Sequence, residues 1–249
     1  MRKPAGQEFL KKTRLDGGVP TPQQMGLAQP RLETEVDREL PIFNLPQPDT
    51  FPAMPVDFLA FVELRTSVRE YANKALTQEE LSFLLWCTQG VKQVVPRAAT
   101  FRTVPSAGAR HALETYLLIN RVEGLEPGLY RFLALDHQLQ QLSAEAAWPE
   151  VLSHACKGQE IVKNSAVSFF WVAESPRMTW RYGERGYRYL FLDAGHVCQN
   201  LYLSSEAVGC GCCAIGAFDD EALHDLLDLG EEERFVVYGA AVGKKYKVE

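Results

Sequence analysis

The distribution of proline constrains this chain more than any other feature. Nine of the 14 prolines lie within the first 55 of 249 residues. Proline has no backbone N–H group and its ring clashes with the preceding helical turn, so a segment this rich in proline is neither a continuous helix nor a central strand. We therefore expect residues 1–55 to form an irregular arm around a body of residues 56–249, with one short helix near Gln7–Lys12.

The composition of the chain is that of a globular protein with a substantial core. Hydrophobic residues make up 46%, and the formal net charge is −6. An acidic chain lacks the basic field that nucleic-acid-binding proteins present, and no apolar run approaches the roughly 18–20 residues that span a bilayer. The start "MRKPAGQEF" lacks the apolar stretch of a secretory leader. We expect a cytoplasmic protein with neither a nucleic-acid nor a membrane partner.

Hydrophobic periodicity predicts a mixture of helices and strands. Thr77 and Glu80 have the spacing of a capping box, Gly90 follows as a helix stop, and Asp219 is placed to cap a later helix. Helices are expected at 56–64, 77–90, 144–156, 159–163, 184–208 and 220–229. Strands are expected at 113–122, 129–135, 137–143, 166–173 and 234–243, and residues 91–110 are expected to form a loop. This order, which includes a hairpin, predicts an α+β sheet covered by helices.

The segment 184–208 is predicted to be a long helix that is apolar around most of its circumference. Its main stripe contains Leu190, Ala194, Val197, Leu201, Ser204 and Val208. Such a helix is typically buried, either in the core or in a subunit interface. In that setting we interpret His196, Gln199 and Asn200 as structural rather than catalytic, and Cys198 as a core residue.

Six cysteines are present, and three of them form the cluster "CGCC" at Cys210, Cys212 and Cys213. Zinc sites usually combine two well-separated Cys/His pairs, and the sequence has no second pair. We therefore predict buried packing of small residues here rather than a metal site.

The stretch "ELRTSVREY" places Arg65, Ser67 and Arg69 two residues apart. In an extended segment these side chains share one face, and guanidinium groups with a hydroxyl suit a phosphate or another small anion. A solvated polar turn after a helix explains the same residues. The stretch alone leaves both interpretations open.

Four stretches taken together carry a resemblance to a known family: "RTSVR", "RTVPSAGAR", "RYGERGYRYLFLDAGHVCQN" and "GCGCCAIGAF". In this order and at these separations they resemble the FMN-dependent nitroreductases, and within them the SagB-type dehydrogenases, from about Thr13 to Lys244. The resemblance implies a nitroreductase-like fold with a central, mostly antiparallel sheet flanked by helices. It also implies an intertwined homodimer with FMN at the subunit interface.

The resemblance assigns the RTSVR stretch to the cofactor. Arg65 and Ser67 are then expected at the phosphate and Arg69 near the pyrimidine edge of the flavin, with Thr66 in the same binding stretch. A cation near N1 and O2 favours reduced flavin, which carries negative charge there. Lys244 is a further candidate for the phosphate, although a solvated basic end of the chain explains it equally well.

Two small-residue segments are also assigned to the flavin by resemblance. Small residues allow backbone to approach a flat ring closely. Arg102 is a candidate for an added polar contact. The first segment consists of Pro105, Ser106, Ala107 and Gly108 and is expected along the ring. The second consists of Gly216 and Ala217 and is expected to offer a backbone N–H to flavin N5.

Arg181 and Tyr182 are the candidate catalytic pair. In peptide azoline dehydrogenases the corresponding pair is typically Lys-Tyr, so Arg181 departs from that pattern. Arginine is a poor proton acceptor because its pKa stays above about 12, whereas Tyr182 remains a candidate proton donor. The departure casts doubt on azoline oxidation and does not affect flavin binding.

The sequence thus predicts an FMN-dependent oxidoreductase with two-step hydride transfer from NAD(P)H through FMN N5 to a small acceptor. It contains no dinucleotide-binding fingerprint, so NAD(P)H is expected to visit the flavin site without a domain of its own. Two alternatives stay open. One is a SagB-type dehydrogenase that oxidises a peptide azoline or another small molecule with oxygen as acceptor, and the other is a flavin-binding protein without turnover.

Overall fold

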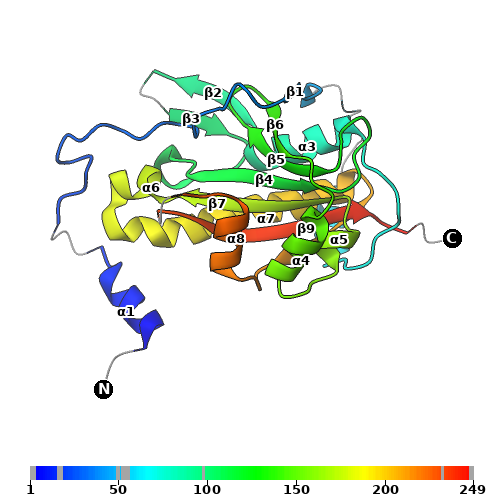
Figure 1. Ribbon diagram of the computed structural model, residues 1–249. Helices are drawn as coiled ribbons and strands as arrows, with labels where there is room; N and C mark the ends of the chain where they lie inside the picture. Colours follow the sequence, from blue (N-terminus) through cyan, green and yellow to red (C-terminus); the bar gives the residue numbers. More distant parts are fainter. Residues whose placement is uncertain are drawn as a thin grey trace.

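A seven-stranded antiparallel sheet forms the centre of the molecule (Figure 1). The computed structural model describes residues 4–15, 19–48, 51, 57–96, 99–230 and 233–246. Within them the main sheet has the order β1-β6-β5-β4-β7-β9-β8, and β2 and β3 form a separate two-stranded ribbon. The strands are β1 (Ile42–Asn44), β2 (Val91–Val95), β3 (Ala99–Arg102), β4 (Leu113–Ile119), β5 (Gly128–Leu133), β6 (Gln138–Ser143), β7 (Val167–Glu174), β8 (Cys210–Ile215) and β9 (Arg234–Lys244).

Helices connect these strands and cover the sheet. The α-helices are α1 (Ala5–Lys12), α2 (Phe58–Leu64), α3 (Gln78–Gln89), α4 (Trp148–Ala155), α5 (Ile161–Asn164), α6 (Ser175–Tyr182), α7 (Gly186–Ala207) and α8 (Asp220–Leu226). Two 3-10 turns, η2 (Ala107–Ala109) and η3 (Gly183–Arg185), precede β4 and α7. The predicted capping box at Thr77 and Glu80 is present at the start of α3, and Asp219 caps α8.

The central strands are apolar on both faces because helices pack on both sides of the sheet. In β7, Phe169 and Trp171 face one core cluster, while Phe170 and Val172 face the other. All four side chains are fully buried. Two-sided burial explains why "AVSFFWVA" reads as an unbroken apolar run rather than an alternating one. The predicted α+β fold with an antiparallel sheet flanked by helices is therefore confirmed.

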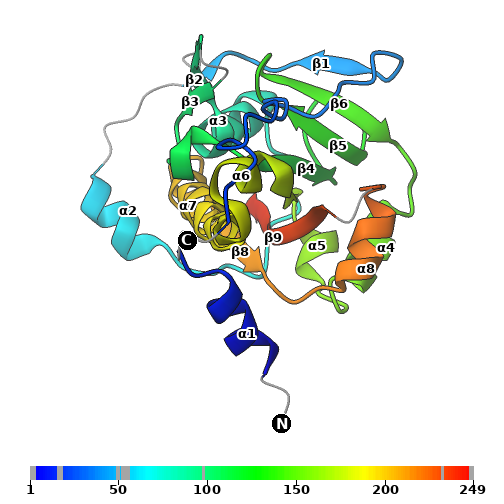
Figure 2. The ribbon, with the colours of Figure 1, turned by 90° about the vertical axis from the view of Figure 1, so that its left-hand side faces the viewer.

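The two faces carry different helices (Figure 2). Helices α3, α6 and α7 pack together on one side, and α4, α5 and α8 lie on the other. Helix α7 contacts α3, α6, β8 and β9, and its predicted stripe is buried. The cysteines of β8 are buried free thiols, as predicted for small-residue packing.

The expectation of a loop over residues 91–110 was wrong for 91–95 and 99–102, whereas 103–110 contain no strand or α-helix. Val91–Val95 and Ala99–Arg102 pair as an antiparallel hairpin outside the main sheet. Most of β2 is exposed or half-buried. The buried residues of β3 are Ala99, Thr100 and Arg102, two of which are polar, so the sequence of the ribbon lacks the regular apolar alternation that reveals a half-buried strand.

The expected single helix over 184–208 is preceded by a helix that the sequence reading missed. Gly183 ends α6 with φ 53° and ψ −145°, a conformation essentially restricted to glycine. After the turn η3, α7 begins at Gly186. Phe191 is 52% and Leu192 59% exposed within one chain, so burial of this side of the helix in a subunit interface stays a prediction.

The proline-rich arm contains the expected short helix as α1 and also supplies a strand. Residues Ile42–Asn44 pair with Gln138–Gln140 of β6 at the edge of the sheet. Between α1 and β1 the arm runs along the outside of the molecule (Figure 1). The division into an arm of 1–55 and a body of 56–249 stays a prediction.

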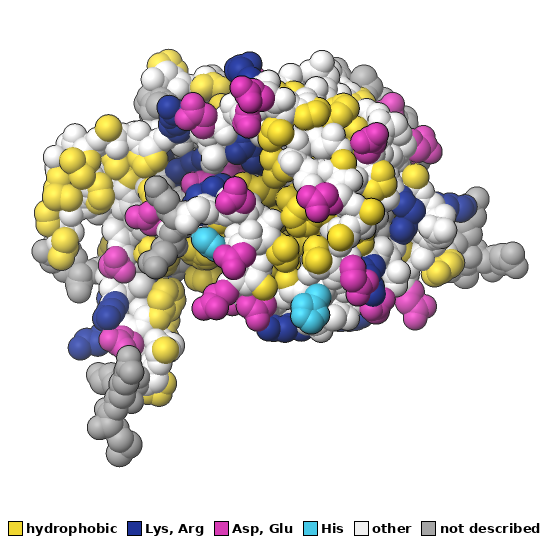
Figure 3. Space-filling view, in the orientation of Figure 1, with side chains coloured by type: hydrophobic (Ala, Val, Ile, Leu, Met, Phe, Trp, Pro, Cys, Tyr) yellow, Lys and Arg dark blue, Asp and Glu magenta, His cyan; other side chains and the backbone are white. Residues whose placement is uncertain are grey.

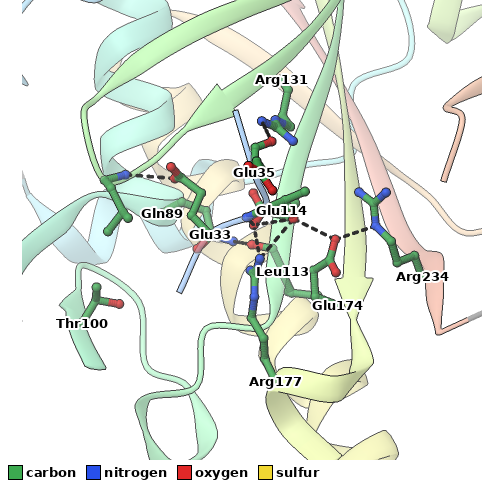
Figure 4. Close-up of polar contacts among 12 residues, drawn as sticks. Glu33, Glu35, Gln89, Thr100, Leu113, Glu114, Arg131, Glu174, Arg177 and Arg234 are labelled. Atoms are coloured by element: carbon green, nitrogen blue, oxygen red, sulfur yellow. Dashed lines mark hydrogen bonds and ion pairs between the residues drawn. The ribbon is translucent and has the colours of Figure 1, made fainter. Parts of the chain in front are cut away.

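A buried charge network ties the arm to the sheet and to α6 (Figure 4). Arg177 forms an ion pair with Glu114 at 2.7 Å, and both side chains are at most 6% exposed. The Thr34 N–H donates to the same Glu114 oxygen at 3.0 Å. Burial alone would raise the pKa of Glu114, but Arg177 and the Thr34 N–H outweigh it and hold the pKa below its ordinary value. The carboxylate therefore stays charged and fixes the arm at Thr34.

The network continues through a second acid. The Thr34 hydroxyl donates to Glu174 at 2.9 Å, and Arg234 donates to the same oxygen at 2.6 Å. Arg234 also donates to the Tyr116 hydroxyl at 2.9 Å. These contacts join the arm to β4, β7 and β9, so the arm next to α6 has a fixed course.

Candidate active site

Tyr202 on α7 gathers the first group of predicted cofactor residues. Its hydroxyl oxygen lies 2.9 Å from the Ser67 hydroxyl and accepts the Ala214 N–H at 2.9 Å. The Arg65 guanidinium lies 5.4 Å from the centre of its ring. Burial raises the pKa of Tyr202, although the Ser67 and Ala214 contacts oppose that shift. The phenol therefore stays neutral at physiological pH and joins Arg65 and Ser67 to β8.

Gly216 and Ala217 follow directly after the strand that Tyr202 holds. Both residues are exposed. Among the residues that the structure describes, their backbone N–H groups have no hydrogen-bond partner. The Gln159 amide donates to the Ala217 carbonyl at 2.7 Å, which fixes this segment against the loop before α5. Exposed backbone donors therefore lie at the end of the strand that is fastened to Arg65 and Ser67.

Arg69 has surroundings different from those of Arg65 and Ser67. Its guanidinium donates to the Ser67 carbonyl at 3.4 Å. It also lines a cavity of about 470 Å³ together with Arg121 and Asn164, and neither Arg65 nor Ser67 lines that cavity. Burial raises the pKa of the Cys213 thiol, and the nearby Arg69 charge opposes this shift. The three side chains of the motif thus do not all meet at Tyr202.

The loop of Ser106–Gly108 lies against the candidate catalytic pair. Gly108 has φ 58°, and a Cβ placed on it would be 2.5 Å from the Tyr182 hydroxyl and 3.0 Å from Arg181 Cδ. No other residue fits there without displacing these side chains, because the position needs both the left-handed backbone and the space. The Arg181 guanidinium lies 5.7 Å from the Tyr182 ring centre.

Asp193 on α7 supports this loop, and the sequence reading missed it. One carboxylate oxygen accepts the Ala107 N–H at 3.3 Å, and the other is buried without a hydrogen-bond partner among the described residues. Burial raises the pKa of Asp193, while Ser106 and Ala107 oppose the shift. The Ser106 hydroxyl in turn accepts the His111 N–H at 2.9 Å. The sequence feature that could have revealed Asp193 is an acidic residue on the otherwise apolar side of a long helix, within "LDAGH".

Helix α7 keeps the two groups apart within one chain. Asp193 and Tyr202 are nine residues apart, which corresponds to about 13 Å along the helix axis. Arg65, Ser67 and the end of β8 lie near one half of the helix. The loop of Ser106–Gly108, Arg181 and Tyr182 lie near the other half.

Residues 62–244 match the Nitroreductase family. This chain belongs to the nitroreductase family. Members of this family generally bind flavin, and membership in it indicates that this chain is an oxidoreductase. The match spans both halves of the site, from the segment before Arg65 to Lys244.

Individual relatives agree with this assignment. A Methanocaldococcus jannaschii protein named as a nitroreductase, MJ1384, is 36% identical over 167 residues, which cover 67% of this chain and 82% of that protein. The trifolitoxin-processing protein TfxB of Rhizobium leguminosarum bv. trifolii is 29% identical over 112 residues, which cover 43% of this chain and 30% of that protein.

Solved structures show the same fold. A protein of Anabaena variabilis named as a nitroreductase superposes with a TM-score of 0.65 at 28% identity, covering 76% of this chain but only 38% of its own. The Escherichia coli microcin synthetase complex McbBCD matches with a TM-score of 0.60 at 17% identity, covering 96% of this chain and 87% of the matched one. At that identity the second likeness concerns the fold alone.

The remaining candidates of this nitroreductase have varied surroundings. The Lys244 ammonium pairs with Glu80 and donates to the Val208 carbonyl at 3.0 Å, so its phosphate role stays a prediction. Thr66 and Pro105 are exposed. Arg102 is buried, where it donates to Gln89 at 3.0 Å, and burial lowers its pKa to about 10.

The residues of α7 that were read as structural divide into two kinds. The Asn200 amide donates to the Cys87 carbonyl of α3 at 2.9 Å, and Cys198 is buried, which confirms packing roles for both. His196 and Gln199 are exposed within one chain, on the same outward side of α7, so their structural roles stay a prediction.

Among the described residues, no helix of this nitroreductase is both long and apolar enough to cross a membrane.

Proposed function

We propose that this nitroreductase is an FMN-dependent oxidoreductase of the cytoplasm that passes electrons from NAD(P)H to a small acceptor in two steps. One observation carries the proposal. Tyr202 joins a cation, Arg65, and a hydroxyl, Ser67, to the strand that ends in the exposed backbone donors of Gly216 and Ala217. A phosphate-binding group and a backbone donor segment are the two features that a bound FMN requires.

The residues present fit the cofactor. Arg65 and Ser67 would hold the phosphate, with Thr66 in the same stretch, and Arg69 would contribute positive charge near the pyrimidine edge. Gly216 and Ala217 would supply backbone N–H groups, and the loop of Pro105–Gly108 would lie along the ring. When bound, FMN supplies a carrier that accepts and releases two electrons.

Other residues act around the cofactor. Asp193 holds the Ala107 N–H and so orients the loop, while Gly108 allows Arg181 and Tyr182 to lie against it. Tyr182 would donate a proton to the acceptor as it is reduced. Arg181 would remain charged and stabilise negative charge that develops on the acceptor. The two halves of the site lie near opposite halves of α7, and in a homodimer they would be completed across the interface.

One alternative has a specific observation in its favour. TfxB is named for trifolitoxin processing, and the microcin synthetase structure contains a protein of the same fold. By this likeness the chain would oxidise a peptide azoline or another small molecule, with oxygen as acceptor. Arg181 argues against it, because the base expected there would be a lysine and arginine does not give up its proton.

The experiment measures how much FMN the protein binds and which compound reduces it. Purified protein is incubated with FMN, washed and denatured, and the released flavin is measured. The visible spectrum of the loaded protein is then recorded without oxygen before and after NADH or NADPH is added. We expect stoichiometric FMN and bleaching by a reduced nicotinamide alone. Bound FMN that is bleached only by an azoline peptide would support the alternative. Bound FMN without steady-state turnover would indicate a binding protein, and absence of stoichiometric FMN would refute the proposal.

A further inference from the structure

A cavity of about 690 Å³ lies between the N-terminal arm and α6 with its following turn η3. The arm is held there by two hydrogen bonds with Trp180: the Gln23 N–H donates to the Trp180 carbonyl at 2.8 Å, and the Trp180 indole N–H donates to the Leu27 carbonyl at 2.9 Å. The size is within the range of pockets that take small molecules, roughly 300–1,000 Å³. The arm therefore forms one wall of a cavity large enough for a small-molecule ligand.

The other wall contains the candidate catalytic pair. Arg181 and Tyr182 line the cavity, together with Gly183. The same two side chains contact Gly108 of the loop assigned to the flavin. A molecule in this cavity would thus lie beside the residues proposed to act on the acceptor.

The described part of the lining carries more basic than acidic side chains. Among the described residues that line the cavity, Lys12, Arg14, Arg181 and Arg185 are basic, and Glu184 is the single acid. Lys12 is paired outside the cavity with Glu8 at 3.1 Å, and Arg185 donates to the Thr13 carbonyl at 3.3 Å. Arg14 and Arg181 form no ion pair with any residue that the structure describes. This local charge contrasts with the net charge of −6 for the whole chain.

The arm also presents apolar side chains at the cavity. Leu15, Val19 and Met25 line it and are 78%, 85% and 55% exposed. Figure 3 shows hydrophobic side chains gathered on the side of the molecule where the arm and α6 lie. Exposed apolar side chains next to cations that have no ion pair among the described residues favour a ligand that has both an anionic group and an apolar body.

We propose that this cavity binds organic anions whose apolar body carries a reducible group, such as nitroaromatic carboxylates, as the acceptor substrates of the enzyme. The nitro group would take up the two electrons that NAD(P)H supplies and, with two protons, would give a nitroso group and water, while the carboxylate would serve for binding alone. The role as acceptor rests on the proposed function, whereas the binding does not. The anionic group would be met by the cationic lining to which Arg14 and Arg181 contribute, and the apolar body would contact the arm. The arm then selects the substrate. It lies outside the range that matches the family, which begins at residue 62.

The test compares two probes of the same size, 4-nitrobenzoate and the neutral 4-nitrobenzamide, by calorimetric titration of the FMN-incubated protein. We expect the wild type to bind the carboxylate more tightly and to lose that preference as salt is raised. Arg14→Gln should weaken carboxylate binding about fivefold, because an exposed charge pair contributes up to about 1 kcal/mol. It should leave binding of the amide unchanged.

Lys11→Gln is the matched control, because it removes one charge from the same arm at a residue that does not line the cavity. It should change neither affinity. The proposal is overturned if the wild type does not prefer the carboxylate, if Arg14→Gln weakens both probes equally, or if the two variants behave alike. Binding that follows the expected pattern in a protein with no turnover would support the cavity while refuting the proposed function. Turnover without the carboxylate preference would support the proposed function while refuting the binding of organic anions in this cavity.

Discussion

At the scale of single residues, Arg65 and Arg69 lie two residues apart and have different surroundings. Arg65 lies over the Tyr202 ring, whereas Arg69 lines a separate cavity and influences Cys213. If Arg65 binds the FMN phosphate, Arg65→Ala should weaken FMN binding by about 1.5–3 kcal/mol, the usual contribution of a charge-assisted hydrogen bond. The flavin potential should change little, because the phosphate is remote from the ring. Flavin titration and redox titration measure the two quantities.

Arg69→Ala is the complementary variant. Loss of a cation near the pyrimidine edge should make bound flavin harder to reduce, by tens of millivolts, since about 30 mV corresponds to about 1.4 kcal/mol for two electrons. Arg69→Lys should recover part of this shift, because the charge matters more there than the planar guanidinium. Equal losses of affinity with no change of potential in either alanine variant would show that the assignment of Arg69 to the ring is wrong.

His111, beside the loop of Ser106–Gly108, should make stability depend on pH. Burial, together with the positive charge of Arg102, lowers its pKa from the ordinary 6.5 to about 3. Between these values the unfolded chain binds a proton that the folded chain excludes, so stability should fall as pH decreases from 6.5 toward 3. The contribution is at most about 1.4 kcal/mol per pH unit.

The matched variant for this effect is His111→Asn. Asparagine tolerates the left-handed backbone of this position, where φ is 44°. Chemical denaturation at several pH values should give a shallower pH dependence for the variant than for the wild type. Superimposable profiles would show that His111 does not contribute.

At the scale of elements, α7 organises the molecule by presenting different residues on its two faces. Leu201 is fully buried, whereas Leu192 is 59% exposed. Leu201→Ala should lower the free energy of unfolding by about 2–5 kcal/mol, because it removes buried contacts and leaves a cavity. Leu192→Ala should cost much less in the monomer. Denaturant titration of both variants measures the difference, and similar losses would contradict the observed orientation of the helix.

The elements differ in how clearly the sequence predicts them. The strands of 113–143 and the strand that begins at Val167 were predicted because their apolar side chains fill two core clusters. The hairpin of β2 and β3 was missed because β2 is exposed or half-buried and β3 buries Ala99, Thr100 and Arg102, which give no apolar alternation. Helix α6 was missed although it contains Arg181 and Tyr182, because its single buried turn is short and Gly183 separates it from α7.

At the scale of the whole molecule, exposed apolar residues predict that two chains associate. In addition to Phe191 and Leu192, α2 exposes Phe58 and Leu59 at 66% and 65%, and α2 contacts α7. A surface of this kind is uncommon on a monomer. Sedimentation at micromolar concentration should give twice the chain mass of 28.0 kDa.

A charged variant tests which surface is involved. Leu192→Asp should produce monomers and weaken FMN binding, if the two halves of the site belong to different subunits. Leu135→Asp, an exposed position on the turn between β5 and β6, serves as the control and should remain dimeric. A wild-type chain that sediments as a compact monomer would refute both the dimer and the shared flavin site.

The sequence by itself determined those features that depend on local chemistry. The capping box of α3, the Asp219 cap and the doubly buried central strands follow from the residue types and their spacing. The prolines of the first 55 residues excluded long regular elements there. The joint order of four motifs also indicated the family, which the match over residues 62–244 confirms.

Only the tertiary structure decided which of these residues meet. Tyr202 and Asp193 lie on a helix whose sequence gives no sign that one holds Ser67 and the other holds Ala107, because both contacts join segments far apart in the chain. The same holds for the arm. Its course over α6 depends on the buried pair of Glu114 and Arg177, whose charges are stable only when Thr34 and the surrounding protein replace the water that burial removes.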